Sequence, residues 1–475
     1  MTGQTLLILT VGIPLLGAFL LPLAGRVSPK FRNALAFILV AAPLVLSILA
    51  LPSSLKSPSV LQITLPLGLS FGLMADGLAV FMAISASLIG LIIVGYSFGY
   101  MSHASNQSEY YFFVALFIGA MMGIVYSTDL FFLYLFWEIS ALCCWRLIGF
   151  FREKEFVRRA NKAFLITVFG ALLMLAGFIM IYVQNGTTDL LALKGQPIAT
   201  AAVVLILFGL LSKSATLPLH SWLADAGVAP SPVTALLHAA VLVKIGVYVF
   251  ARLFLVNFTL DDVWHTVVPI IAAVSSLVCA GAAIAENDIK RIIAYSTVSQ
   301  IGYIFLGISV GGGLAAAGGI LYILMHGISK AGLFLCAGIV EHTYHTKDIR
   351  ELGGLAKTMP VTAVSFLLCA FSVMGIPPFG GFFSKYMVIN GAAAAGQPWV
   401  AFTFLLGAVF TVVYLLRAFT KVFLGEPKRE LKKEGSLSMV SSVALLAALS
   451  LVSGLLVQIP AGFVETLVRQ LVVAA

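Results

Sequence analysis

The chain has 475 residues, of which 61% are hydrophobic and only 10% are charged. A soluble protein typically has about 25% charged residues, so this composition excludes a water-soluble domain and predicts a protein embedded in a bilayer. A nucleic-acid-binding protein would need a clustered basic face, and the charges behind the net +9 are instead spread among the connections between apolar runs.

At about 20 residues per transmembrane helix, roughly fourteen apolar runs follow one another along the chain. The first is expected to be a transmembrane helix and not a signal peptide, because its basic residues follow the apolar run instead of preceding it. The expected fold class is therefore all-α, a polytopic membrane protein of about fourteen transmembrane helices. The runs are centred near Leu15, Val40, Ser87, Leu116, Phe136, Leu172, Val204, Leu242, Ala273, Phe305, Leu324, Leu367, Phe410 and Leu446.

Basic residues are unevenly divided between alternate connections. The connections after even-numbered runs contain only Lys56, Lys194 and Arg252. Those after odd-numbered runs contain Arg26, Lys30, Arg32, Arg152, Lys154, Arg158, Arg159, Lys162, Lys290, Arg291, Lys347, Arg350, Lys357, Lys421, Lys428, Arg429, Lys432 and Lys433. Because cytoplasmic loops collect Lys and Arg, we expect a multi-pass protein of the prokaryotic cytoplasmic (inner) membrane with both termini on the outer side.

Ionisable side chains also lie inside the apolar runs or at their ends. They are Glu138, Arg146, Lys213, His220, His238, Lys244, His326, Lys330, Lys385 and Arg417. A charge at the bilayer centre costs several kcal/mol, so such groups face a cavity or a partner. His326 and Lys330 are four residues apart and share one helix face. His238 and Lys244 are six apart, which predicts that they point to different sides of a regular helix.

Two of the runs are interrupted by helix breakers. Pro218 follows Lys213 in "KSATLPLHSW", and Pro377 and Pro378 precede Lys385 in "GIPPFGGFFSK". Irregular backbone at membrane depth survives where it is buried in protein or lines a wet cavity, and paired interruptions suggest an inverted repeat with an ion site at the midplane. The predicted units are residues 1–107 (helices one to three), 108–257 (helices four to eight), 258–425 (helices nine to thirteen) and 426–475 (helix fourteen), with helices seven and twelve broken.

Lysine and glutamate in this setting suit proton transfer. Burial lowers the pKa of a lysine towards neutrality, whereas a nearby carboxylate such as Glu138 keeps it charged, so a Glu–Lys pair with further lysines and histidines forms a switchable relay. Structural alternatives remain: an ion pair of Glu138 with Arg146, a charge partner role for Lys244, a core histidine at His326, or helix capping by Lys385.

No cofactor or metal site is expected. The five cysteines contain no Cys-x-x-Cys pair, which argues against an iron–sulfur or zinc site. "GGGLAAAGG" at residues 311–319 follows no strand and is not a nucleotide loop. We expect a membrane subunit without redox groups of its own, and any redox chemistry of the enzyme it serves would belong to other subunits.

Six segments resemble those of a known family. "FWEISA", "KSATLPLHSWLADA", "APSPVTALLHAAVLVKIGVY", "DIKRIIAYSTVSQIGY", "MHGISKAGLFLCAGIV" and "GIPPFGGFFSK" are similar to signature segments of the antiporter-like, proton-translocating membrane subunits of respiratory complex I, multisubunit cation/proton antiporters and membrane-bound hydrogenases. The resemblance covers about residues 76–421. It implies that the proton-translocating residues are Glu138 and Lys213 (helices five and seven), Lys244 (helix eight), His326 and Lys330 (helix eleven) and Lys385 (helix twelve).

The expected function is proton translocation within a multisubunit complex, either an NADH-quinone oxidoreductase of the complex I type or a membrane-bound hydrogenase. A proton would enter from the cytoplasm through Lys244 towards Lys213 and leave at Lys385, with the Glu138–Lys213 pair as the gate. Relay or supporting roles are expected for His220, His238, Asp225 and Arg146. The alternatives are a subunit of a multisubunit sodium/proton antiporter and a structural anchor.

The expected partners are other membrane subunits, including homologous antiporter-like subunits, and lipids. A peripheral redox arm would be an indirect partner in a complex I-like or hydrogenase-like assembly, and no nucleic acid is expected.

Overall fold

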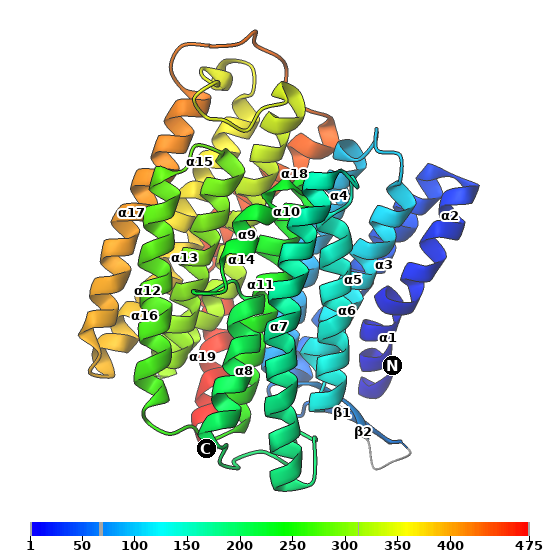
Figure 1. Ribbon diagram of the computed structural model, residues 1–475, viewed down its shortest axis with the longest axis vertical. Coiled ribbons are helices and arrows are strands. Elements are labelled where there is room, and N and C mark those ends of the chain that lie inside the picture. Colours follow the sequence, from blue (N-terminus) through cyan, green and yellow to red (C-terminus); the bar gives the residue numbers. More distant parts are fainter. Residues whose placement is uncertain (1, 66–69, 312, 474–475) are drawn as a thin grey trace.

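The computed structural model describes residues 2–65, 70–311 and 313–473, and it is mostly helical (Figure 1). The α-helices are α1 Gly3–Gly17, α2 Leu21–Val27, α3 Pro29–Ser54, α4 Gly77–Tyr100, α5 Gln107–Tyr126, α6 Leu130–Ile148, α7 Lys154–Asn185, α8 Thr200–Lys213, α9 Ser221–Asp225, α10 Ser231–Ala235, α11 Leu242–Phe250, α12 Trp264–Ala285, α13 Ile289–Ser309, α14 Gly313–Tyr344, α15 Pro360–Met374, α16 Gly380–Ala394, α17 Pro398–Phe423, α18 Leu437–Leu455 and α19 Gln458–Val473.

Several short elements connect or extend these helices. The 3₁₀ turns are η1 Ala18–Leu20, η3 Ala226–Val228 and η6 Leu355–Lys357. The π-helical segments are η4 Leu236–Ala240 and η5 Ala251–Asn257, on either side of α11. An antiparallel hairpin, β1 Ser59–Thr64 and β2 Ser70–Ala75, pairs Ser59 with Ala75. The all-α expectation omitted this hairpin, which lies in one of the connections.

Within the described residues, twelve helical segments are long and apolar enough to cross a membrane. Two shorter apolar helices, α8 and α15, lie where the sequence predicts interrupted spans. The multi-pass character is therefore confirmed, while the number fourteen stays a prediction. The last predicted helix consists of two segments, α18 and α19, separated at residues 456 and 457.

Both predicted breaks are present in the structure. Helix α8 ends at Lys213, and helical structure resumes only at Ser221. Helix α15 ends at Met374 before Gly375, and α16 begins at Gly380. Each break exposes backbone carbonyls at the end of an apolar helix, as expected for proline-interrupted segments.

Helices α13 and α14 form the centre of the bundle. In each of them 94% of the most apolar stretch is buried inside the protein, compared with 33% in α3. A helix that is apolar around its whole circumference and buried is typical of a core position. Helix α14 contacts α4, α10, α13, α15, α16, α18 and α19, so side chains on it can reach the second broken segment, α15–α16, and the α10–η4 segment.

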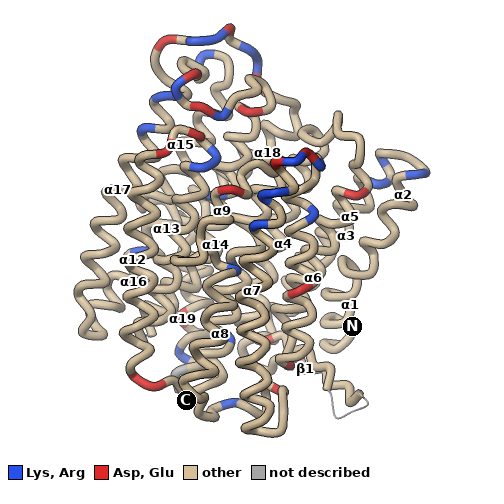
Figure 2. The backbone as a smooth tube through the Cα atoms, viewed as in Figure 1, with Lys and Arg blue, Asp and Glu red and all other residues tan. Residues whose placement is uncertain are grey.

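Figure 2 shows Lys and Arg gathered towards the upper end of the bundle, which we call the basic end. Both chain termini lie in the lower half of the same view (Figure 1). The structure corrects the predicted location of two basic residues that the sequence pattern assigns to connections. Arg252 and Lys290 are buried, with 2% and 0% of their surface exposed, because each is paired with a carboxylate within the bundle.

Two pairs of connections have the same construction at different positions of the chain. Asp129 forms an antiparallel bridge with Asp189, and Asp288 forms one with Asp348. The side chains of Asp129 and Asp288 each accept two backbone N–H groups at the start of the following helix, α6 or α13. Such N-terminal capping satisfies donors that have no partner within the helix. Helices α6 and α13 are thus started in the same way.

A buried polar axis as candidate functional site

Lys213 is the last residue of α8 and lies directly at the first break. Its side chain is fully buried, and Nζ donates a hydrogen bond to the carbonyl oxygen of Trp137 on α6 at 3.1 Å. The ammonium position also lies 5.1 Å from the centre of the Trp137 ring, within the range of a cation–π interaction. The indole of Trp222 donates to the carbonyl of Ser212 at 3.0 Å, which satisfies one of the carbonyls at the end of α8.

Glu138 follows Trp137 on α6 and is half-buried. Its Oε1 is buried without a hydrogen-bond partner among the described residues. The alternative partner Arg146 is engaged elsewhere, because its Nε lies 2.5 Å from Glu109 Oε1 and its Nη1 donates to the carbonyl of Gly149. Glu138 is therefore adjacent to the acceptor of Lys213, and the ion pair with Arg146 is absent from this structure.

Lys244 joins α11 to α14. Its Nζ lies 2.6 Å from His326 Nδ1 and donates to the carbonyl oxygen of His238 at 3.1 Å. The spacing of six predicts different directions for His238 and Lys244, but the π-helical turn η4 and the irregular residue Val241 intervene. Both side chains consequently face α14: Lys244 contacts His326, and the His238 ring lies 4.5 Å from the Phe334 ring.

His326 and Lys330 occupy neighbouring turns of α14, as their spacing predicts. Both are fully buried. His326 binds Lys244, whereas Lys330 reaches α13, where Nζ donates to Ser296 Oγ at 2.5 Å and to the carbonyl of Ile293 at 3.2 Å. The two residues thus connect α14 to α11 on one side and to α13 on the other.

A chain of hydroxyl and amide groups continues from Lys330. Ser296 Oγ lies 2.7 Å from Tyr414 Oη, Gln300 Nε2 donates to Tyr414 Oη at 3.5 Å, and Tyr322 Oη donates to Gln300 Oε1 at 2.5 Å. The sequence prediction missed these residues. Ser296 and Gln300 are four apart and share one face of α13, but this spacing alone does not distinguish them from polar residues elsewhere in the helices.

Lys385 lies at the far end of this chain, behind the second break. Its Nζ donates to the carbonyl oxygen of Val373, near the end of α15, at 2.6 Å. It also lies 5.6 Å from the ring centre of Tyr322 and 5.4 Å from that of Tyr303. Lys385 therefore binds a carbonyl at the end of its own broken segment, whereas Lys213 binds a carbonyl of the neighbouring helix α6.

Of the supporting candidates, Arg146, Asp225 and His220 are located outside this line of contacts, whereas the carbonyl of His238 binds Lys244. Asp225 pairs with Lys162 at 2.6 Å and with Arg291 at 3.1 Å. His220 is half-buried in the first break, and its Nδ1 has no partner among the described residues. The sequence did not predict the buried ion pair of Arg252 and Asp76, in which Arg252 donates two hydrogen bonds at 2.5 and 2.7 Å. It was missed because Arg252 was assigned to a connection.

We define the polar axis as the set of described residues Glu138, Lys213, Lys244, His326, Lys330, Ser296, Tyr414, Gln300, Tyr322 and Lys385. Six of its members are the predicted proton-translocating residues. Hydrogen bonds join Lys244 to His326 and connect Lys330 to Tyr322. Exchangeable protons on lysine, imidazole, hydroxyl and carboxyl groups allow such a line to hold and move protons.

Comparison with solved structures finds the same architecture. A chain of the Mrp complex from Dietzia sp. DQ12-45-1b superposes with a TM-score of 0.90 and 27% sequence identity, over 99% of this chain and 98% of that one. A chain of the membrane-bound sulfane sulfur reductase, an archaeal respiratory membrane complex, superposes with a TM-score of 0.89 and shares the fold at 23% identity, over 98% of this chain and 97% of that one.

Curated relatives are longer than this chain. The Na(+)/H(+) antiporter subunit A1 of Staphylococcus haemolyticus is 34% identical over 495 aligned positions, which cover 95% of this chain and 61% of the relative. The subunit of the same name from Staphylococcus aureus is 32% identical over 493 positions, with the same coverage. The chain thus spans about 61% of the length of these relatives.

Two family profiles match the sequence. Residues 63–127 match the family described as NADH-ubiquinone oxidoreductase (complex I), chain 5 N-terminus. Residues 127–411 match the family described as NADH:quinone oxidoreductase/Mrp antiporter, TM. Since this second match includes more than half of the residues and the fold agrees along the whole chain, the protein belongs to the NADH:quinone oxidoreductase/Mrp antiporter transmembrane family.

Proposed function

We propose that this chain translocates protons across the membrane as an antiporter-like subunit of a multisubunit complex. The observation that carries the proposal is the polar axis, in which Lys213, Lys244, Lys330 and Lys385 are all buried and each binds a neutral acceptor. A permanently charged lysine in such surroundings is costly. A lysine that alternates between its charged and neutral forms suits this burial, since none of the four forms an ion pair with a carboxylate among the described residues.

Unpaired polar atoms support a hydrated axis. Glu138 Oε1, Ser214 Oγ, both ring nitrogens of His238 and His326 Nε2 are buried without a hydrogen-bond partner among the described residues. Buried polar groups in proteins are almost always satisfied by protein or ordered water, and internal water typically makes about three hydrogen bonds to such groups. We infer that water joins Lys213 to Lys244 and His326 to Lys330.

The proposed direction runs from the basic end towards Lys385. The enrichment of Lys and Arg assigns the basic end to the cytoplasm, and both termini then lie on the outer side. A proton enters through Lys244, exchanges with Lys213, and passes along His326, Lys330 and the hydroxyl chain to Lys385. Glu138 sets the proton affinity of Lys213, because a nearby carboxylate favours the charged lysine.

We further propose that residues 108–257 and 258–425 are two inverted five-helix repeats, flanked by units 1–107 and 426–475. The matching bridges Asp129–Asp189 and Asp288–Asp348 support this division. In each bridge, the first residue precedes the second helix of its unit and the other residue follows the third helix. The breaks after Lys213 and Met374 also occupy the same position in the two units.

A second candidate is a subunit of a multisubunit sodium/proton antiporter. It is favoured by the Staphylococcus relatives, which are Na(+)/H(+) antiporter subunits 32–34% identical to this chain. In that case the same axis supplies the proton half of the exchange. In either assembly the proposed partners are other membrane subunits, including antiporter-like ones, and lipids, and a peripheral redox arm is a partner only in an oxidoreductase or hydrogenase complex.

The test is proton transport by the assembled complex in sealed vesicles. We expect Lys244→Ala to lower the rate by about 100-fold or more, the scale of a positioned proton-transfer group, and Glu138→Gln to lower it as well. Lys421→Ala, at an exposed position in the last turn of α17, serves as the matched control and should transport normally. Normal transport by the Lys244 variant would contradict the proposal. A strict requirement for sodium ions would select the antiporter assembly.

A further inference from the structure

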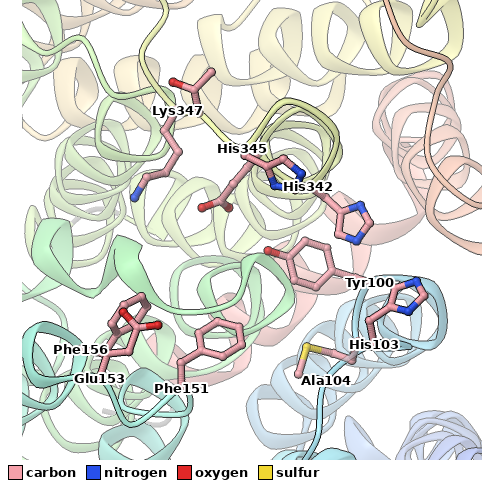
Figure 3. Close-up of a pocket in the computed structure, with 12 residues that line it drawn as sticks. Tyr100, His103, Ala104, Phe151, Glu153, Phe156, His342, His345 and Lys347 are labelled. Atoms are coloured by element: carbon pink, nitrogen blue, oxygen red, sulfur yellow. The ribbon is translucent and has the colours of Figure 1, made fainter.

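A pocket of about 700 Å³ opens at the basic end of the bundle. Three connections that are far apart in the sequence form its walls: the end of α4 with the following loop, the loop before α7, and the end of α14 (Figure 3). In Figure 3, Tyr100, His103 and His342 lie together on one side, while Glu153 and Phe156 lie on the opposite side.

Histidine is unusually concentrated around this pocket. The chain contains seven histidines, and three of them line this one cavity. The ionisable side chains that face the pocket besides Tyr100 are His103, Glu153, Glu341, His342, His345 and Lys347. Lys347 is partly neutralised by Asp288, whose Oδ2 lies 3.5 Å from its Nζ. Imidazole is the side chain whose ordinary pKa, about 6.5, permits proton exchange near neutral pH.

The end of α14 positions two of these imidazoles. His342 is in the last turn of the helix, with its ring 5.4 Å from that of Tyr100. His345 follows the helix in a left-handed conformation, φ 54°, and its backbone N–H donates to the carbonyl of Glu341 at 2.8 Å. Burial and the neighbouring imidazoles of His103 and His345 lower the pKa of His342, whereas the Glu341 carboxylate acts in the opposite direction. A proton held by His342 is therefore readily released.

Glu341 connects the pocket to the interior. Its Oε2 accepts hydrogen bonds from Ser231 Oγ at 2.8 Å and from the buried Lys290 Nζ at 3.0 Å. Both bonds use the same oxygen. The carboxylate also lines the pocket, so it is accessible to a proton from that side while it is anchored from within.

The helices behind Glu341 lead to the polar axis. Ser231, at the start of α10, binds Glu341 near the end of α14. Seven residues after Ser231, His238 packs on Phe334, which lies seven residues before Glu341. The α10–η4 segment therefore runs antiparallel to α14 over this distance. At about 1.5 Å per residue, seven residues separate Glu341 from His238 by about 10 Å, and the carbonyl of His238 binds Lys244.

We propose that this pocket is the cytoplasmic mouth of the proton path, in which the three histidines collect protons and deliver them through Glu341 to the α10–α14 interface. The imidazolium of His342 or His345 releases its proton, through water, to the Glu341 carboxylate. Glu341 passes it inward to water beside His238, and the imidazole returns to the neutral form. The inference rests on the proposed function, because a mouth has a purpose only if the axis conducts.

The experiment uses the assembled complex in vesicles, with the pH varied on the side of the basic end. We expect the triple variant His103→Gln/His342→Gln/His345→Gln to transport protons several-fold more slowly, most of all above pH 7, where collection from water is limiting. Added imidazole on the same side should restore much of the rate, which a merely structural role of the histidines would not predict. His265→Gln is the matched control, since His265 is in the first turn of α12 and does not line this pocket.

The outcomes distinguish this proposal from the one on which it rests. The proposed proton entrance is overturned if the triple variant has normal rates at every pH, or if it is slow and imidazole does not restore its rate. In either case, loss of transport in Lys244→Ala still supports the polar axis. Normal transport in Lys244→Ala overturns the axis itself. If the triple variant does not assemble, His103→Gln and His345→Gln replace it, because both positions are exposed, and the same rate and rescue criteria apply.

Discussion

Lys385 has two kinds of neighbour, a carbonyl oxygen and two aromatic rings. Its Nζ binds the Val373 carbonyl and lies within 5.6 Å of the ring centres of Tyr303 and Tyr322. Both interactions favour the charged lysine, but neither supplies a full counter-charge. Tyr322, whose hydroxyl donates to Gln300, is therefore the member of the axis that contacts this lysine through its ring.

Removing that hydroxyl isolates Lys385 without removing its aromatic neighbour. We expect Tyr322→Phe to slow proton transport while leaving assembly intact, because the ring remains and only the hydrogen bond to Gln300 is lost. Tyr126→Phe is the matched control: Tyr126 is also buried, and its hydroxyl lies 2.8 Å from Ser47, away from the axis. Equal transport by the two variants would show that the hydroxyl chain carries no protons.

The difference between predicted and unpredicted site residues has a physical reason at this scale. Lys213, Lys244 and Lys385 stand out in the sequence because a charge in hydrocarbon is costly. Ser296 and Tyr414 carry no such cost, so nothing in their local sequence distinguishes them from serine and tyrosine elsewhere. Their role becomes visible only when α13, α14 and α17 are placed side by side.

At the scale of elements, the two breaks depend on a few backbone conformations. Gly375 ends α15 with φ 83°, and a Cβ at this position would lie 3.1 Å from Lys385 Cδ. A non-glycine residue rarely adopts this backbone conformation, so the same glycine both ends the helix and leaves room for the lysine. The break and the lysine position are therefore coupled.

Gly375→Ala tests this coupling. Alanine at a positive φ costs about 1 kcal/mol or more, and here its Cβ also displaces Lys385, so we expect both lower thermal stability and slower transport. Gly396→Ala shares the unfavourable backbone, φ 74°, but its Cβ would meet no atom within 4 Å. It should lose stability to a similar extent and keep its transport rate. A comparable loss of transport in both variants would refute the coupling.

Elements were predictable where a breaker residue or a long apolar run marks them. Pro218 and Pro377 located both breaks, and the apolar run around Phe305 located α13. The π-helical turn η4 was not predictable, since "LLHAA" contains no breaker. This turn changes the direction of His238 relative to Lys244. The prediction that the two side chains point to different sides of a regular helix was therefore wrong.

At the scale of the whole molecule, polar groups from α6, α8, α11, α13, α14, α16 and α17 meet within one apolar bundle. No single helix reveals this arrangement, because each one contributes at most three members of the polar axis; the family resemblance indicated which lysines and histidines belong together. What the sequence could not supply is the continuity of the line, which depends on contacts between residues more than thirty positions apart, such as Lys244 with His326 and Lys330 with Ser296.

A high-resolution density map of the assembled complex, with resolved water, tests that continuity most directly. The account predicts ordered water between Lys213 and Lys244, between His326 and Lys330, and at both ends of the axis, where Glu138 and Lys385 have no direct hydrogen bond to Lys213 and Tyr322. Apolar side chains packed tightly in those intervals, with each lysine enclosed in a separate dry pocket, would contradict it.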